Sequence, residues 1–289
     1  MNQNEYFAWH DHDPHARSYQ ALTGKKARAI AARLGHVAAT DMPLCLGCHT
    51  DDVPPARRGE KFSLAQGVDC EACHGGAQKW IGLHYLQDAD PAALQADGMY
   101  PTWEPKARAA LCAGCHEYGT RGGDHRLMAA GHPRFPDDLA SYLQKWPRHY
   151  TMDADYIRRK HPVAENVERN FYRLRQATDW SAALAASEAH PRGMLPEFSF
   201  LQCDSCHRPT KVTGSVLVDY PKPGDDALRR LLAEPGAIKA ARRAEIEQDL
   251  TRLSQALAGG SRADYAAAAI SLHGTLMNME SDASPGAGH

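Results

Sequence analysis

Long apolar runs are missing from this sequence. No stretch approaches the roughly 18 consecutive apolar residues that a membrane-spanning helix needs, and the mean hydropathy is −0.54. An excess of one charge is missing as well, because 33 Lys and Arg oppose 35 Asp and Glu and no long basic tract stands out. The sequence therefore predicts no transmembrane segment and gives no electrostatic support for nucleic-acid binding.

Strand-like alternation is scarce, whereas helical periodicity recurs along the chain. Apolar residues three to four positions apart favour helices over 18–34, 104–115, 136–146, 163–190, 225–258 and 261–279. Glycine and proline end or interrupt these stretches, at Gly35, Pro147, Pro191 and Pro235. We therefore predict a mostly α-helical fold.

Cysteine and histidine are the unusual residues, with eight and sixteen copies. All the cysteines fall into Cys-x-x-Cys-His motifs, of which random placement would give roughly 0.01 copies. The four motifs contain Cys45, Cys48 and His49; Cys70, Cys73 and His74; Cys112, Cys115 and His116; and Cys203, Cys206 and His207. This pattern is typical of covalent attachment of c-type haem.

The spacing has a chemical reason. Two thiols three residues apart can form thioethers with the vinyl groups on one edge of a porphyrin, and the histidine that follows can ligate the iron. Zinc ribbons use two cysteine pairs per metal and need no histidine after each pair, and a redox dithiol normally occurs once. Disulfide scaffolds are typical of shorter chains. We predict four covalently attached c-type haems, with helices and long loops wrapped around them.

Twelve further histidines are candidates for the second axial ligand, because neutral imidazole binds iron well. Four of them lie close in sequence to a motif or open a helix beside one, namely His15, His84, His125 and His132. His149, in the run Trp146–Tyr150, is a fifth candidate. The alternatives are His273 for the fourth haem, and Met99, Met128 or Met194 as methionine ligands that would raise the reduction potential.

The spacing of the motifs also predicts the organisation of the chain. Only 25 and 42 residues separate the first three motif histidines, so we expect their haems to lie close together. The fourth follows after 91 residues. We predict a four-haem core over residues 1–210, and a connector with C-terminal helices packed on that core over 211–289.

Several stretches resemble a known family. Four stretches are similar, in order, to the tetrahaem cytochromes c of nitrifying bacteria, which accept electrons from hydroxylamine oxidoreductase. These stretches are Trp9 with the run His15–Tyr19, the first motif, the run Gly67–Gly76 around the second motif, and the third motif. The run Ala129–Arg134, with His149 downstream, resembles a broader group of multihaem cytochromes. The similarity covers about residues 5–210.

This resemblance implies specific ligands. If the ligands of the family are carried over by position, His15 is the distal ligand of the haem at His74, and the haem at His49 is five-coordinate. His84 ligates a haem attached nearer the N-terminus, by a further motif that in the family precedes Trp9. That motif is not in this sequence, so either His84 serves another haem or an N-terminal piece is missing. We expect the second, which a measurement of intact mass tests.

These features predict an electron carrier rather than an enzyme, since ligation by two histidines leaves no iron position for substrate. One alternative is a multihaem oxidoreductase acting on a small nitrogen or sulfur compound at a five-coordinate haem. The other is a subunit of a larger haem assembly with neighbouring cytochrome subunits. We expect redox proteins as partners. Because haem is attached to this motif outside the cytoplasm, we expect a periplasmic or extracellular protein whose precursor carried an export signal.

Overall fold

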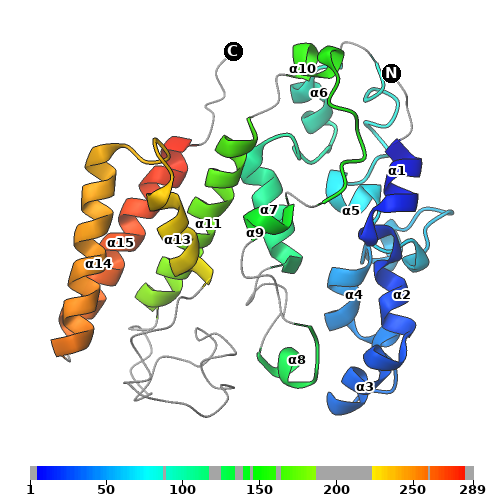
Figure 1. Cartoon of the computed structure of the whole chain (residues 1–289). Helices are drawn as coiled ribbons and strands as arrows, with labels where there is room; N and C mark the ends of the chain where they lie inside the picture. The colour runs from blue at the N-terminus through cyan, green and yellow to red at the C-terminus, as the bar shows by residue number, and fades with distance from the viewer. Residues whose placement is uncertain are drawn as a thin grey trace. The chain divides into compact units, whose positions relative to one another are not determined.

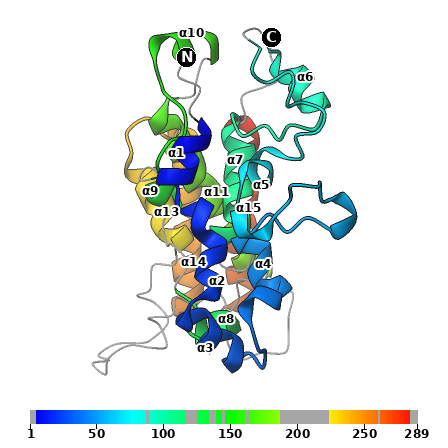
Figure 2. The same ribbon diagram turned by 90° about the vertical axis from the view of Figure 1, so that its right-hand side faces the viewer.

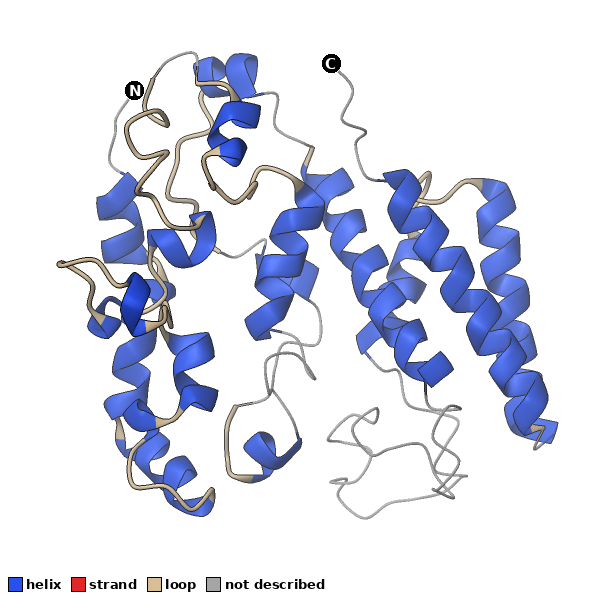
Figure 3. Ribbon diagram, turned by 180° about the vertical axis from the view of Figure 1, so that it is seen from behind, coloured by secondary structure: helices blue, strands red, loops and turns tan. Residues whose placement is uncertain are grey.

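A computed structural model describes residues 5–86, 89–116, 125–133, 139–143, 146–160, 164–186, 223–259 and 261–283. Within these ranges the chain forms α-helices, short 3-10 helices and loops, and no strand (Figure 3). The prediction of a mostly α-helical fold is confirmed. No helix in the described ranges is long and apolar enough to cross a membrane.

The chain divides into two compact units. Unit 1 contains Met1–Pro136 and Tyr142–Pro162, and unit 2 contains Asp137–Ser141 and Val163–His289. The division predicted at residue 210 falls in the segment 187–222, outside the described residues. The assignment of 1–210 to a haem core therefore stays a prediction, and the two units are described separately below.

Unit 1 consists of short helices joined by long loops (Figure 1). Its α-helices are α1 (Glu5–His12), α2 (Ser18–Thr23), α3 (Lys25–Arg33), α4 (Pro43–His49), α5 (Cys70–His74), α6 (Pro91–Ala96), α7 (Pro105–His116), α8 (His125–Ala129) and α10 (Ala154–Lys160), while α9 (Leu139–Leu143) straddles the division. The 3-10 helices are η1 (Pro14–Arg17), η2 (Ala39–Asp41), η3 (Pro55–Arg57) and η4 (Leu64–Gln66).

The helix predicted over 18–34 is wrong in one respect, because it is broken into α2 and α3. Gly24 separates them with an extended backbone of φ −77° and ψ 168°. Gly35 ends α3 with φ 82°, in the left-handed region that glycine adopts readily, as expected of a helix stop. The helix predicted to run into the third motif is confirmed as α7, which ends at His116 itself.

Buried apolar side chains of unit 1 gather in small clusters of mostly small residues. One cluster contains Leu22, Ala27, Ala31, Ala39 and Met42 and joins α2, α3 and η2 to α4. Helices α2 and α4 lie side by side (Figures 1 and 2). Another contains Ile30, Leu127 and Ala130 and joins α3 to α8. Cys45 and Leu46 of α4 pack against the first cluster. The first Cys-x-x-Cys-His motif thus packs against the N-terminal helices.

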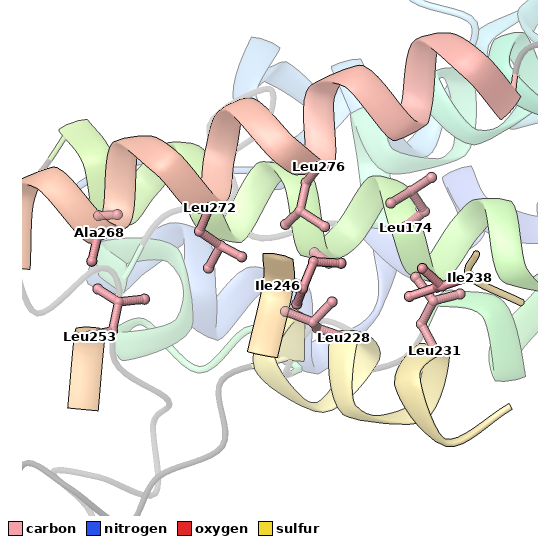
Figure 4. Close-up of a cluster of buried hydrophobic side chains, with 11 residues drawn as sticks. Leu174, Leu228, Leu231, Ile238, Ile246, Leu253, Ala268, Leu272 and Leu276 are labelled. Atoms are coloured by element: carbon pink, nitrogen blue, oxygen red, sulfur yellow. The ribbon is translucent and has the colours of Figure 1, made fainter. Parts of the chain in front are cut away.

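Unit 2 has one continuous apolar core. Its helices are α11 (Glu165–Ala186), α13 (Pro223–Ala233), α14 (Ala240–Gly259) and α15 (Arg262–Ala283). The break predicted near Pro235 is confirmed between α13 and α14, where Gly236 has φ 75°. Ser261 caps α15, since its Oγ accepts a hydrogen bond from the backbone N–H of Asp264 at 3.3 Å. The core members are Leu174, Ala177, Leu228, Leu231, Ile238, Ile246, Leu253, Ala268, Ala269, Leu272 and Leu276 (Figure 4).

We expect Leu272→Ala to lower the free energy of unfolding of unit 2 by about 2–5 kcal/mol, because Leu272 is fully buried and its loss leaves a cavity. Loss of helical circular dichroism in urea measures this change. Ile270→Ala on the same helix is the control, since Ile270 is 61% exposed, and its effect should stay within about 0.5 kcal/mol. Equal shifts for both variants would contradict the core described here.

Candidate functional site

Each described motif lies at the C-terminal end of a helix. Helix α4 ends at His49, α5 at His74 and α7 at His116. Positions three and four residues apart share one face of a helix, so the second cysteine and the histidine of each motif project on the same side as the first cysteine. The helical conformation therefore presents two thiols and an imidazole together. The fourth motif, with Cys203, Cys206 and His207, lies outside the described residues.

The three described motifs lie close together, with the third between the other two. The Sγ atom of Cys115 is 3.9 Å from the carbonyl oxygen of Gly47, inside the first motif. The pKa of Cys73, in the second motif, is raised to about 12, first by burial and then by the neighbouring Cys112. None of the six described cysteines forms a disulfide with another.

Each described motif histidine faces a second histidine from a distant part of unit 1. The centres of the paired rings are 5.8 Å apart for His15 and His116, 6.4 Å for His49 and His132, and 6.2 Å for His74 and His149. The ring planes cross at 87°, 80° and 78°. The fold thus brings three of the predicted distal histidines to the three motifs.

This spacing fits a metal ion held between two imidazoles. Two metal–nitrogen bonds of about 2 Å, with about 1 Å from each nitrogen to the centre of its ring, give about 6 Å between ring centres. Edge-to-face aromatic contacts fall in a similar range. A chance contact, however, does not explain why all three described motif histidines have an imidazole partner at this distance. The residues therefore fit haem iron with two axial histidines.

Burial favours the neutral form of four of the paired imidazoles. The pKa of His74 is lowered to about 4, first by burial and then by the nearby His149 and His84. Burial likewise lowers the pKa of His116 to about 4, with contributions from His15 and His49. Burial also lowers the pKa values of His132 and His149. A neutral imidazole has the nitrogen lone pair that a metal needs.

Hydrogen bonds at Nδ1 leave Nε2 for the metal in several of these rings, which is the usual arrangement for metal-binding histidines. The Nδ1 of His49 donates to the carbonyl oxygen of Ser18 at 2.9 Å, and that of His132 to the carbonyl oxygen of Pro133 at 2.7 Å. The Oγ1 of Thr102 is 3.2 Å from Nδ1 of His74. The Nδ1 of His149 is buried without a hydrogen-bond partner in the described structure.

The group that is hydrogen-bonded to Nδ1 of His15 is a buried carboxylate, unlike the groups at the other rings. Asp13 is 1% exposed, and its Oδ1 accepts hydrogen bonds from the backbone N–H and the Nδ1 of His15, at 2.9 and 2.8 Å. Its Oδ2 accepts one from Nε1 of Trp146 at 2.7 Å. Burial alone would raise the pKa of Asp13, but the hydrogen bonds from His15 and Trp146 bring it below its ordinary value.

The segment before the second motif packs closely on the turn that carries His15. The backbone N–H of Val68 donates to the carbonyl oxygen of His15 at 3.1 Å and to Oγ of Ser18 at 3.0 Å. Gly67 has φ 74°, and a Cβ there would lie 2.5 Å from the same carbonyl oxygen. Only glycine fits this approach without a shift of the backbone. Gly67 thus fixes His15 relative to the motif of Cys70.

The ring pairs differ from those that the family resemblance implied. His15 faces His116 instead of His74, whose partner is His149, and His49 faces His132 instead of an open position. Long-range contacts are the reason for this difference. The hydrogen bond from Trp146 to Asp13 holds the turn that carries His15, and the ring centres of Trp146 and His149 are 5.9 Å apart.

The remaining candidates are not placed opposite a motif in the described ranges. His84 is exposed, its Nδ1 donates to the carbonyl oxygen of Ile81 at 2.7 Å, and its ring lies near those of Trp80 and Tyr85. His125 opens α8, and its side chain lies outside the described part. In unit 2, Nδ1 of His273 is 3.0 Å from Oγ of Ser181.

Sequence reasoning missed Asp13, Trp146 and Thr102 as residues that contact the paired histidines. An aspartate two positions before a histidine is ordinary at a helix start, where it caps the backbone, as Asp13 also does for η1. Trp146 lies 133 residues from Asp13 along the chain. No local pattern could connect them.

Comparison with known proteins gives one match. Residues 2–75 match the profile of the family described as cytochrome c554 and c-prime. The match covers about a quarter of the chain and includes His15 and the first two motifs. No curated protein and no solved structure matches the chain.

Proposed function

From the match to the cytochrome c554 and c-prime family, which supports a multihaem c-type cytochrome, we propose that this chain transfers electrons between redox partner proteins through four covalently bound haems. In this proposal the four motifs hold the haems by Cys45 and Cys48, Cys70 and Cys73, Cys112 and Cys115, and Cys203 and Cys206. The motif histidines His49, His74, His116 and His207 are the proximal iron ligands.

The observation that carries the proposal is the pairing of histidine rings at three motifs. When bound, haem iron supplies one-electron redox chemistry. The paired imidazoles, His15 with His116, His49 with His132 and His74 with His149, would hold the iron of each haem between them. Burial lowers the pKa values of His74, His116, His132 and His149, which keeps their lone pairs available. A substrate could reach the iron only if one of the paired imidazoles moved away.

Proximity of the motifs supports the same function. Cys115 lies beside Gly47 of the first motif, and Cys112 beside Cys73 of the second. The third motif therefore lies beside both the first and the second, an arrangement suited to passing electrons from site to site. The alternative, an oxidoreductase with a five-coordinate haem at His49, is disfavoured by the position of His132.

We place the protein in the periplasm or outside the cell, because c-type haem is attached to its motif outside the cytoplasm. Its partners would be redox proteins that approach the haem edges of unit 1. The subunits of a larger cytochrome assembly are the second class of partner.

Low-temperature electron paramagnetic resonance and near-infrared magnetic circular dichroism of the oxidised protein test the ligation. Both methods count low-spin irons with two histidine ligands. We expect at least three such irons per chain, one for each ring pair. Fewer than three, with a matching high-spin signal, would overturn the proposal and favour an enzyme with an open iron.

A further inference from the structure

The histidine pairs differ in the charge of the group at Nδ1. At His49 and His132 the acceptor is a backbone carbonyl oxygen, and at His74 the neighbouring group is the hydroxyl of Thr102. All of these groups are neutral. At His15 the acceptor is the carboxylate of Asp13.

The carboxylate is fixed and dehydrated. Asp13 is 1% exposed, and both of its oxygens accept hydrogen bonds. The donors are a backbone amide, the imidazole of His15 and the indole of Trp146, none of which carries a positive charge while His15 is neutral. The negative charge therefore stays on Asp13 and acts on the imidazole at 2.8 Å.

A carboxylate that accepts the Nδ1 proton raises the electron density at Nε2 and makes the imidazole a more basic metal ligand. A more basic ligand stabilises the oxidised iron, which has one more positive charge than the reduced iron. The buried negative charge acts in the same direction, because Coulomb interactions are stronger in a site with little water. Both effects favour the oxidised state at His15 and His116.

We propose that Asp13 is a positioning residue that lowers the reduction potential of the haem attached at His116, through its hydrogen bond to His15. This inference rests on the proposed function, since it requires His15 to be the distal ligand of that haem. The carboxylate also fixes the orientation of the His15 ring against His116, whose centre lies 5.8 Å away.

A spectroelectrochemical titration of the full-length holoprotein tests the role of Asp13. We expect Asp13→Asn to raise the potential of one haem so that its equilibrium constant for reduction increases at least tenfold, which is 59 mV for a one-electron couple. Asp90→Asn is the matched control, because Asp90 is an exposed cap at the start of α6. It should leave every potential unchanged.

A second variant assigns the haem. Replacement of an axial histidine by methionine raises the potential, so His15→Met identifies the component that His15 controls. The proposal requires Asp13→Asn to raise that same component. If His15→Met raises one component and Asp13→Asn raises none, or a different one, the role of Asp13 is overturned while the proposed function stands. If His15→Met changes no component, the ligation in the proposed function fails at this haem.

Trp146→Phe keeps the test decisive if Asp13→Asn does not bind haem. Loss of the indole N–H removes one hydrogen-bond donor from Asp13. The negative charge of the carboxylate then acts more strongly on the imidazole of His15. We expect the component assigned by His15→Met to fall in potential, opposite to the effect of Asp13→Asn. An unchanged or raised component would overturn the proposal.

Discussion

Replacement of both cysteines of the third motif, Cys112→Ala with Cys115→Ala, is expected to remove one covalently bound haem from each chain. The two thiols are the attachment points for the vinyl groups, so without them no thioether can form. This motif lies beyond residues 2–75, so the experiment extends the assignment past the matched part of the chain. The haem content per polypeptide should fall from four to three.

Intact mass of the denatured protein measures this loss, because only covalently bound haem remains with the polypeptide. The unsubstituted protein, prepared in parallel, provides the reference. The equivalent change at Cys203 and Cys206 tests the fourth motif, which lies outside the described residues. For either double variant, a fall in mass equal only to the two cysteine-to-alanine changes would contradict haem attachment at the substituted motif.

The second large effect is expected for His132→Ala, which should create a carbon monoxide site at the haem of His49. The ring of His132 is the one that faces His49, at 6.4 Å between centres, and alanine has no atom that can replace it as a ligand. The reduced variant should bind one carbon monoxide more per chain than the unsubstituted protein, measured from the change in the Soret absorption.

His36→Ala is the matched control, because His36 is exposed and lies outside the ring pairs. It should leave carbon monoxide binding as in the unsubstituted protein. If the unsubstituted protein already binds carbon monoxide at the haem of His49, to the same extent as His132→Ala, that haem is five-coordinate. The oxidoreductase function would then gain support, and the role of His132 would be wrong.

Local patterns predicted the helices well where residues close in sequence decide the structure. Helix α7 forms where the periodicity indicated it, and α13 and α14 are separated near Pro235 as expected. The error at Gly24 has a local cause too. A single glycine is compatible with a helix, so the pattern over 18–34 did not distinguish a continuous helix from two helices that meet at an extended residue.

The Cys-x-x-Cys-His motifs could be recognised in the sequence because all of their side chains lie within five consecutive residues. Two thiols and an imidazole at fixed spacing act together in any fold that makes the motif helical, as α4, α5 and α7 do. Proximity to a motif, or to the start of a helix beside one, was enough to select His15 and His132 as candidates for the distal position. His149, 33 residues after His116, is a candidate that such proximity does not single out.

Which histidine faces which motif was decided only by the tertiary structure. The pairs join residues far apart in sequence, such as His15 with His116, and their geometry depends on long-range contacts. The hydrogen bond from Trp146 to Asp13 and the close approach at Gly67 are two of them. Sequence spacing fixes the chemistry that each motif can perform, whereas packing fixes the partner, because an axial ligand is chosen by its position in space.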